Sequence, residues 1–115
     1  MYSPPRVLIG EVNLAPVRVA RYTRGDELHQ AFAFAFLGAP WDILARQSII
    51  NGLLESRIHG GARVTWVAES HDVVRAPTRY GGGARAAARA RAALLALLGL
   101  PGAAYLYQGQ ELGLP

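Results

Sequence analysis

Four short apolar runs, separated by turns and helical patterns, constrain the fold of this 115-residue chain more than any other sequence feature. Residues 6–12 form a short run rich in β-branched residues, which predicts a parallel strand buried on both faces. Residues 31–37 alternate Ala with Phe, and this period of two predicts a second strand. Residues 63–68 and 103–107 give the third and fourth predicted strands.

Helical patterns lie between these predicted strands. Residues 41–58 carry apolar side chains at helical spacing and are followed by the stop signal His59-Gly60-Gly61. Residues 84–98 are rich in Ala, Leu and Arg, which have high helix propensity. A weaker helical pattern covers residues 17–28. Strands that alternate with helices predict an α/β fold with a parallel sheet and right-handed crossovers.

The length of the repeating unit indicates which parallel architecture is expected. Four units in 115 residues average about 29 residues each, close to the roughly 30 residues per unit of an eight-stranded (β/α)8 barrel. The sequence therefore predicts half of a TIM barrel, as one domain over residues 1–115. Such a half sheet leaves two strand edges unpaired, at residues 6–12 and 103–107, and we expect the isolated chain to self-associate through them.

Composition excludes several classes of function. The chain has no cysteine, and its three histidines lack ligand spacing, so no metal site is expected. All twelve basic residues are Arg, which indicates a codon bias, and the aromatic residues lie in strand patterns rather than among the Arg. We therefore expect no nucleic-acid partner. The longest apolar stretch is interrupted by Pro101 and no targeting segment is visible, so a cytoplasmic protein without membrane contact is expected.

Candidate chemistry lies where the predicted parallel strands end, since working residues of such barrels sit at the carboxyl ends of the strands. Glu11 follows the first predicted strand, and His71-Asp72 follows the third. Two carboxylates that converge on one site are what glycosidic cleavage requires. Structural roles remain open as well: Glu11 could cap the next element or pair with an Arg, and Asp72 could simply orient the His71 ring.

Four segments, in chain order, resemble conserved blocks of the α-amylase superfamily of glycoside hydrolases (family 13). They are residues 7–11 (VLIGE), 22–32 (YTRGDELHQAF), 66–75 (WVAESHDVVR) and 107–113 (YQGQELG). Within the superfamily, the chain is most similar to bacterial α-glucosidases and oligo-1,6-glucosidases. The resemblance covers essentially the whole chain and implies barrel strands five to eight of a partial catalytic domain.

The resemblance also implies a role for individual residues. Glu11 matches the general acid/base at the end of strand five. Asp72 matches the carboxylate that stabilises the oxocarbenium-like transition state after strand seven, and His71 matches a histidine that binds the same sugar. Arg75 and Arg79 lie in a stretch that helps to line the substrate site of α-glucosidases. The implied substrate is a short α-glucoside oligosaccharide, and the implied reaction needs no cofactor.

The chain departs from the family pattern at important positions. The family's nucleophile is an Asp at the end of strand four, yet no residue before Glu11 is acidic. Ser70 stands where the family usually has Asn. These departures leave two hypotheses: part of a retaining α-glucosidase that is inactive alone, or a non-catalytic remnant that binds sugar or assembles with a complementary half.

Overall fold

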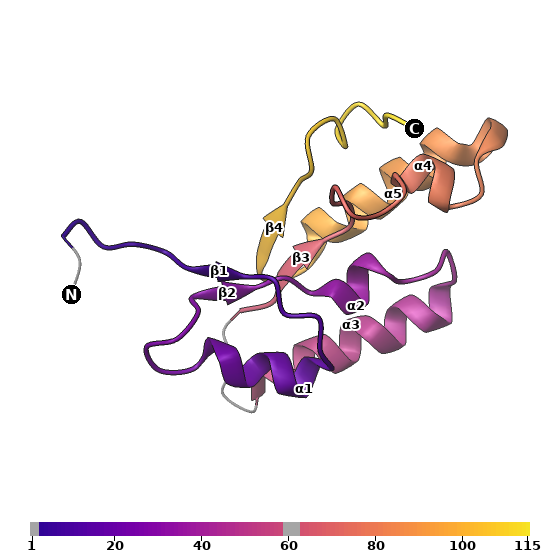
Figure 1. The fold of residues 1–115 in the computed structure, drawn as a ribbon. Helices are drawn as coiled ribbons and strands as arrows, with labels where there is room; N and C mark the ends of the chain where they lie inside the picture. The colour runs from indigo at the N-terminus through magenta and orange to yellow at the C-terminus, as the bar shows by residue number, and fades with distance from the viewer. Residues whose placement is uncertain (1–2, 59–62) are drawn as a thin grey trace.

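Figure 1 shows the fold in a computed structural model, which describes residues 3–58 and 63–115. The elements in chain order are β1 (Ile9–Gly10), α1 (Pro16–Val19), the 3-10 helix η1 (Ala20–Thr23), β2 (Gln30–Ala31), α2 (Phe34–Leu37), α3 (Ile43–Ile58), β3 (Thr65–Val67), α4 (Ala76–Arg79), the 3-10 helix η2 (Gly83–Arg85), α5 (Ala86–Gly99) and β4 (Ala103–Tyr105). Strands alternate with helices, which confirms the predicted α/β class.

The strands pair in parallel, as predicted. Strand β1 pairs with β2, with Ile9 opposite Gln30, and β3 pairs with β4, with Trp66 opposite Ala104. A single parallel bridge between Phe32 and Thr65 links the two pairs. The strands therefore follow the order β1-β2-β3-β4, with β1 and β4 at the outside.

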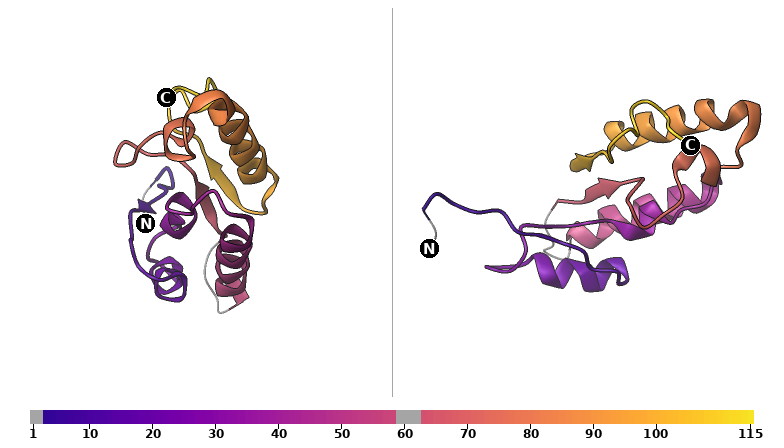
Figure 2. Two further views of the ribbon diagram at one scale, coloured as in Figure 1. Left: turned by 90° about the vertical axis from the view of Figure 1, so that its right-hand side faces the viewer. Right: turned by 45° about the horizontal axis from the view of Figure 1, so that its top comes forward.

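The core lies between β3 and the helices that flank it. Trp66 on β3 is fully buried and meets the Phe36 ring of α2 edge-on, with the ring centroids 5.2 Å apart. Leu53 of α3 and Leu97 of α5 complete this cluster from two further helices. In Figure 2 (left), the long helices α3 and α5 lie on one side of β3 and β4.

Trp66 also fixes the chain reversal between α5 and β4. Its indole Nε1–H donates to the Pro101 carbonyl at 3.0 Å. The next residue, Gly102, has a φ of 144°, and a Cβ at this position would lie 2.2 Å from the Val64 carbonyl oxygen. A side chain is thus excluded where the turn approaches β3, which is why glycine is required at this one position.

The expectation of a first strand buried on both faces is wrong. Only Ile9–Gly10 pair with a neighbouring strand, and the Val7 and Leu8 side chains are 65% and 55% exposed. Among the described residues, β1 pairs with β2 alone. The expectation holds instead for β3, whose three residues are all buried.

The predicted strand over residues 31–37 is correct only at its beginning. Pairing ends at the Phe32 bridge, and Phe34–Leu37 form the helical turn α2. After Ala31, the buried residues of this segment are Ala33, Phe36 and Leu37, and their spacing of three and four is that of a helix. An alternation of Phe with Ala is compatible with both the period of a strand and that of a helix. Packing of Phe36 against Trp66 favours the helix.

The long helices agree with the prediction better than the short ones. Helices α3 and α5 fall within residues 41–58 and close to 84–98. The pattern over residues 17–28 forms only α1 and η1, and α4 was not predicted. The expected stop signal at residues 59–61 lies outside the described residues. None of the helices in the described part of the chain is long and apolar enough to cross a membrane.

Candidate functional site

The parallel strands end at one edge of the sheet, and the polar candidates follow them there. Glu11 comes directly after β1, and Glu69 to Asp72 follow β3. Strand β4 continues into Leu106 and Tyr107. The local sequence favours this arrangement because β1 and β3 are short and contain no charged residue, so the first carboxylates come after the strand ends.

Two adjoining concavities lie at this edge, and together we call them the strand-end hollow. The smaller, of about 200 Å³, is lined by Glu11, Phe32, Phe34, Val67, Glu69, Ser70, His71, Tyr105, Leu106 and Tyr107. The larger, of about 510 Å³, is lined by Glu11, Asn13, Phe34, Leu37, Gly38, Ser70, Asp72 and Val73. Glu11, Phe34 and Ser70 line both. The structure therefore brings Glu11 together with His71 on one side and with Asp72 on the other.

The Glu11 carboxylate is exposed and uncommitted within the described residues. It makes no hydrogen bond or ion pair with any of them, and no side chain caps the start of α1, whose N-cap residue is Ala15. Neither structural alternative, capping or pairing with an Arg, is observed. An accessible carboxyl at the junction of two concavities is available to exchange a proton with a bound molecule.

His71 and Asp72 form a loose, exposed pair. The His71 Nε2 lies 3.4 Å from the Asp72 Oδ1, and the two side chains are 67% and 65% exposed. The Ser70 hydroxyl accepts the Asp72 backbone N–H at 3.2 Å, which shapes the turn that carries both residues. Because both side chains remain largely solvated, each keeps polar atoms free for a ligand.

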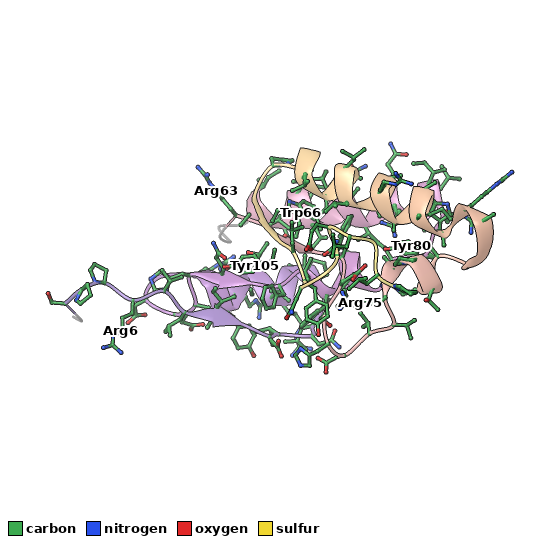
Figure 3. All side chains as sticks on the ribbon, turned by 90° about the horizontal axis from the view of Figure 1, so that it is seen from above. Arg6, Arg63, Trp66, Arg75, Tyr80 and Tyr105 are labelled. Carbon is green, nitrogen blue, oxygen red and sulfur yellow. The ribbon has the colours of Figure 1, made fainter. Side chains whose placement is uncertain are left out.

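An ion pair that sequence reasoning missed, between the buried Glu69 and the partly exposed Arg75, anchors this turn. Glu69 is 2% exposed; its Oε1 accepts the Ala76 backbone N–H at 3.0 Å and its Oε2 accepts Arg75 Nη1 at 3.1 Å. Arg75 Nη1 also donates to the Gln108 carbonyl at 2.7 Å, and its Cζ lies 4.5 Å from the Tyr107 ring centroid. The pair closes the loop of residues 69–76 at its base and joins it to the segment after β4 (Figure 3).

Arg79 is directed into the protein rather than into the hollow. Its guanidinium donates to the Leu37 and Ala68 carbonyls and, at 3.2 Å, to the Tyr80 hydroxyl. These bonds join the end of α2 to the end of β3. The structure thus does not bring Arg75 or Arg79 into the lining of the hollow, and contact of either with substrate stays a prediction.

An aromatic wall is the second feature that sequence reasoning missed. The Phe32 and Tyr105 rings meet edge-on at 5.2 Å, and Phe34 lies 6.1 Å from Phe32 between ring centroids. The Tyr105 hydroxyl donates to Gln30 Oε1 at 2.9 Å, so this side chain spans from β4 to β2 (Figure 3). In the sequence, the Phe residues predicted only a strand. No local pattern predicted that Tyr105 would lie beside them.

The donor set suits an organic ligand better than a metal ion. Within residues 3–58 and 63–115, no three His, Asp or Glu side chains gather closely enough to hold a metal. The hollow instead combines carboxylates, an imidazole and aromatic faces. Carboxylates and imidazole bind hydroxyl groups, and aromatic rings pack against apolar C–H faces, which is the chemistry of sugar recognition.

Comparison with known proteins agrees with this chemistry. The family model of the alpha-amylase catalytic domain matches residues 1–115. Among solved structures, the α-glucosyl transfer enzyme XgtA matches with a TM-score of 0.82 and 33% sequence identity, over 94% of this chain and 20% of that chain. The chain thus spans a fifth of the length of this relative. No curated protein sequence matches the chain. Because the family model matches the chain over its whole length, the chain belongs to the alpha-amylase catalytic-domain family, glycoside hydrolase family 13, whose catalytic domain is a (β/α)8 barrel.

Proposed function

We propose that the strand-end hollow is one part of a binding site for an α-linked glucosyl unit, in a domain that supplies strands five to eight of the barrel. The observation that supports this most strongly is that Glu11 and Asp72 line the same concavity, after the parallel pairs β1-β2 and β3-β4, which a single parallel bridge links. Both carboxylates remain open to a ligand from solvent.

In the proposed reaction Glu11 acts twice. Its carboxyl group first donates a proton to the glycosidic oxygen, while a nucleophilic carboxylate attacks the anomeric carbon and the glycosidic bond breaks. Its carboxylate then removes a proton from water, whose oxygen attacks the anomeric carbon; the bond from that carbon to the nucleophilic carboxylate breaks, and the sugar is released. Asp72 stabilises the positive charge that develops at that carbon, and His71 binds a hydroxyl of the same sugar. We propose that Arg75 and Arg79 support substrate binding by holding the loop that carries these residues.

Transfer to an acceptor sugar is a second candidate, and the match to an α-glucosyl transfer enzyme favours it. The two reactions share the first step and differ only in whether water or a sugar hydroxyl attacks the glucosyl intermediate. Glu11 would remove the proton from either acceptor. The ratio of transfer to hydrolysis therefore depends on contacts with the acceptor and not on Glu11, His71 or Asp72.

Binding of a glucose mimic tests the proposal on the chain itself. A cationic iminosugar such as 1-deoxynojirimycin carries positive charge near the position where the transition state develops it, so it should bind between Glu11 and Asp72. We expect amide shifts in an NMR titration at residues 11, 70–72 and 105–107. An Asp72→Asn variant should bind at least tenfold more weakly, about 1.4 kcal/mol.

The matched control is Asp26→Asn, which removes an exposed carboxylate from the loop after η1. This variant should bind the iminosugar as the unmodified chain does. Amide shifts confined to the outer face of α3 would contradict the proposed site. An equal loss of iminosugar affinity in Asp72→Asn and Asp26→Asn would also contradict it.

The chain alone is expected to show no α-glucosidase turnover. None of the residues before Glu11 is acidic, so the nucleophile that the family pattern places there has no counterpart in the sequence. Without it the covalent intermediate cannot form. The measurement is release of nitrophenol from a nitrophenyl α-glucoside by the purified chain. Turnover that disappears in a Glu11→Gln variant would show that another group replaces the nucleophile.

A further inference from the structure

Glu69 is a buried carboxylate at the strand-end hollow, and both of its oxygens are bound by the protein itself. Its side chain is 1% exposed, although the residue belongs to the lining of the smaller concavity. Oε1 accepts the Ala76 backbone N–H, and Oε2 accepts Arg75 Nη1. A buried charge needs such partners to compensate for the loss of water. Glu69 therefore holds the segment of residues 69–76, here called the 69–76 loop, rather than a ligand.

Arg75 contacts two segments that lie far apart in the sequence. On one side it pairs with Glu69 inside the 69–76 loop. On the other side its Nη1 donates to the Gln108 carbonyl at 2.7 Å, and its Cζ lies 4.5 Å from the centroid of the Tyr107 ring. A guanidinium attracts the face of an aromatic ring, and a charged donor forms a stronger hydrogen bond than a neutral one. One cation thus joins the loop to the segment after β4.

The segment after β4 is a turn with its own internal bonds, and we call residues 107–113 the 107–113 turn. The Gln110 Oε1 accepts the Tyr107 backbone N–H at 3.1 Å, and the Gln110 backbone N–H donates to the Tyr107 carbonyl at 2.9 Å. Gly109 has a φ of 80°, and a Cβ at this position would lie 3.8 Å from Arg75 Nη1. Glycine permits this backbone conformation close to the guanidinium. The turn is therefore a local unit that lies against Arg75.

The loop and the turn both border the hollow. The loop carries Asp72, which lines the larger concavity, and the turn carries Tyr107, which lines the smaller one. We propose that Glu69 is a positioning residue that acts through Arg75 to join the two segments, so that Asp72 and Tyr107 become ordered together. The inference rests on the proposed function only for the identity of the ligand, because the contacts are present without it.

NMR relaxation of the backbone amides in the unliganded chain tests this link. Among the described residues, Glu69 bonds to none in the 107–113 turn, so a substitution at Glu69 can reach the turn through Arg75. In a Glu69→Gln variant, the order parameters of amides 108–112 should fall from about 0.85 to below about 0.6, while those of α3 stay unchanged. A turn that keeps its order would overturn the proposal. An equal fall in α3 would also overturn it, because the pair would then stabilise only the fold as a whole.

The matched control is Glu111→Gln, which removes an exposed carboxylate within the turn itself. This carboxylate forms no ion pair with any described residue, so its loss should leave the order parameters of the turn unchanged. A loss of order equal to that in Glu69→Gln would show that the turn responds to charge alone, and would overturn the assignment of the link to Glu69 and Arg75.

The double variant Glu69→Gln/Arg75→Gln covers the case in which Glu69→Gln does not fold. It leaves no unpaired charge at the base of the loop, and it keeps the net charge of the chain. The shorter, neutral side chain at position 75 cannot hold the loop and the turn at once, so amides 108–112 should again lose order. A turn that stays ordered in this variant would overturn the proposal.

Binding of 1-deoxynojirimycin to the same double variant tests whether the link positions the site. Because the net charge is kept, weaker binding reports the position of the loop and the turn rather than electrostatic attraction of the cationic ligand. We expect the affinity to fall by about fivefold or more. Affinity equal to that of the unmodified chain would overturn the positioning role. If the unmodified chain does not bind the iminosugar, the proposed function fails, and the order of the 107–113 turn still decides whether Glu69 joins it to the loop.

Discussion

A Glu11→Gln substitution is expected to lower turnover by about 10²–10⁴-fold in a hybrid enzyme that contains this chain. The hybrid replaces the matching segment of XgtA, which is 33% identical to this chain and superposes over 94% of it. The remainder of that enzyme is expected to supply the nucleophile. The amide of Gln cannot donate a proton to the glycosidic oxygen, although it occupies nearly the same volume as the carboxyl group.

The control for this prediction is Glu55→Gln, the same change on the exposed outer face of α3. It should leave turnover of the hybrid within a factor of two. Circular dichroism would establish that both hybrids fold equally. A Glu11→Gln hybrid that keeps its activity would show that the strand-end hollow does not supply the acid.

Replacement of Trp66 by Ala is expected to destabilise the chain by about 3–5 kcal/mol. Trp66 is fully buried, and its ring centroid lies 5.2 Å from that of Phe36. Its indole N–H donates to the Pro101 carbonyl. Its removal leaves a cavity beside β3 and an unpaired carbonyl. Such a loss approaches the entire stability of a small domain. Urea unfolding at a fixed protein concentration measures the effect.

The chain's other tryptophan provides the control. Trp41 is 41% exposed, and its ring centroid lies 5.2 Å from that of Tyr80. Trp41→Ala should therefore lower the free energy of unfolding clearly less than Trp66→Ala does. If Trp66→Ala does not fold, Trp66→Phe removes the hydrogen bond and part of the volume and should give an intermediate loss. Equal losses at positions 41 and 66 would contradict the described core.

The parallel α/β arrangement could be predicted because its main elements have unambiguous patterns. Helix α3 has helical spacing over four turns, and β3 is a short apolar run between breakers. Residues 31–37 could not be assigned correctly, because an alternation of Phe and Ala fits a strand and a helical turn equally well. The contact between Phe36 and Trp66, which lie 30 residues apart, decides between them.

The candidate site could be predicted in part for a similar reason. Residues that follow parallel strands meet at one edge, so the proximity of Glu11 to Asp72 follows from strand order. The directions of the Arg75 and Arg79 side chains could not be predicted. They depend on the burial of Glu69 and on the position of carbonyl groups in distant segments.

The dependence of kcat/KM on the leaving group in the Glu11→Gln hybrid tests the central claim most directly. This constant reports the steps up to cleavage of the glycosidic bond. A dinitrophenolate leaves without a proton, whereas a sugar alkoxide requires one. If Glu11 is the acid, the substitution should lower kcat/KM at least tenfold more for a disaccharide than for a dinitrophenyl α-glucoside. Equal losses for the two substrates would contradict the assignment of Glu11 as the acid of a glucosyl-transferring site.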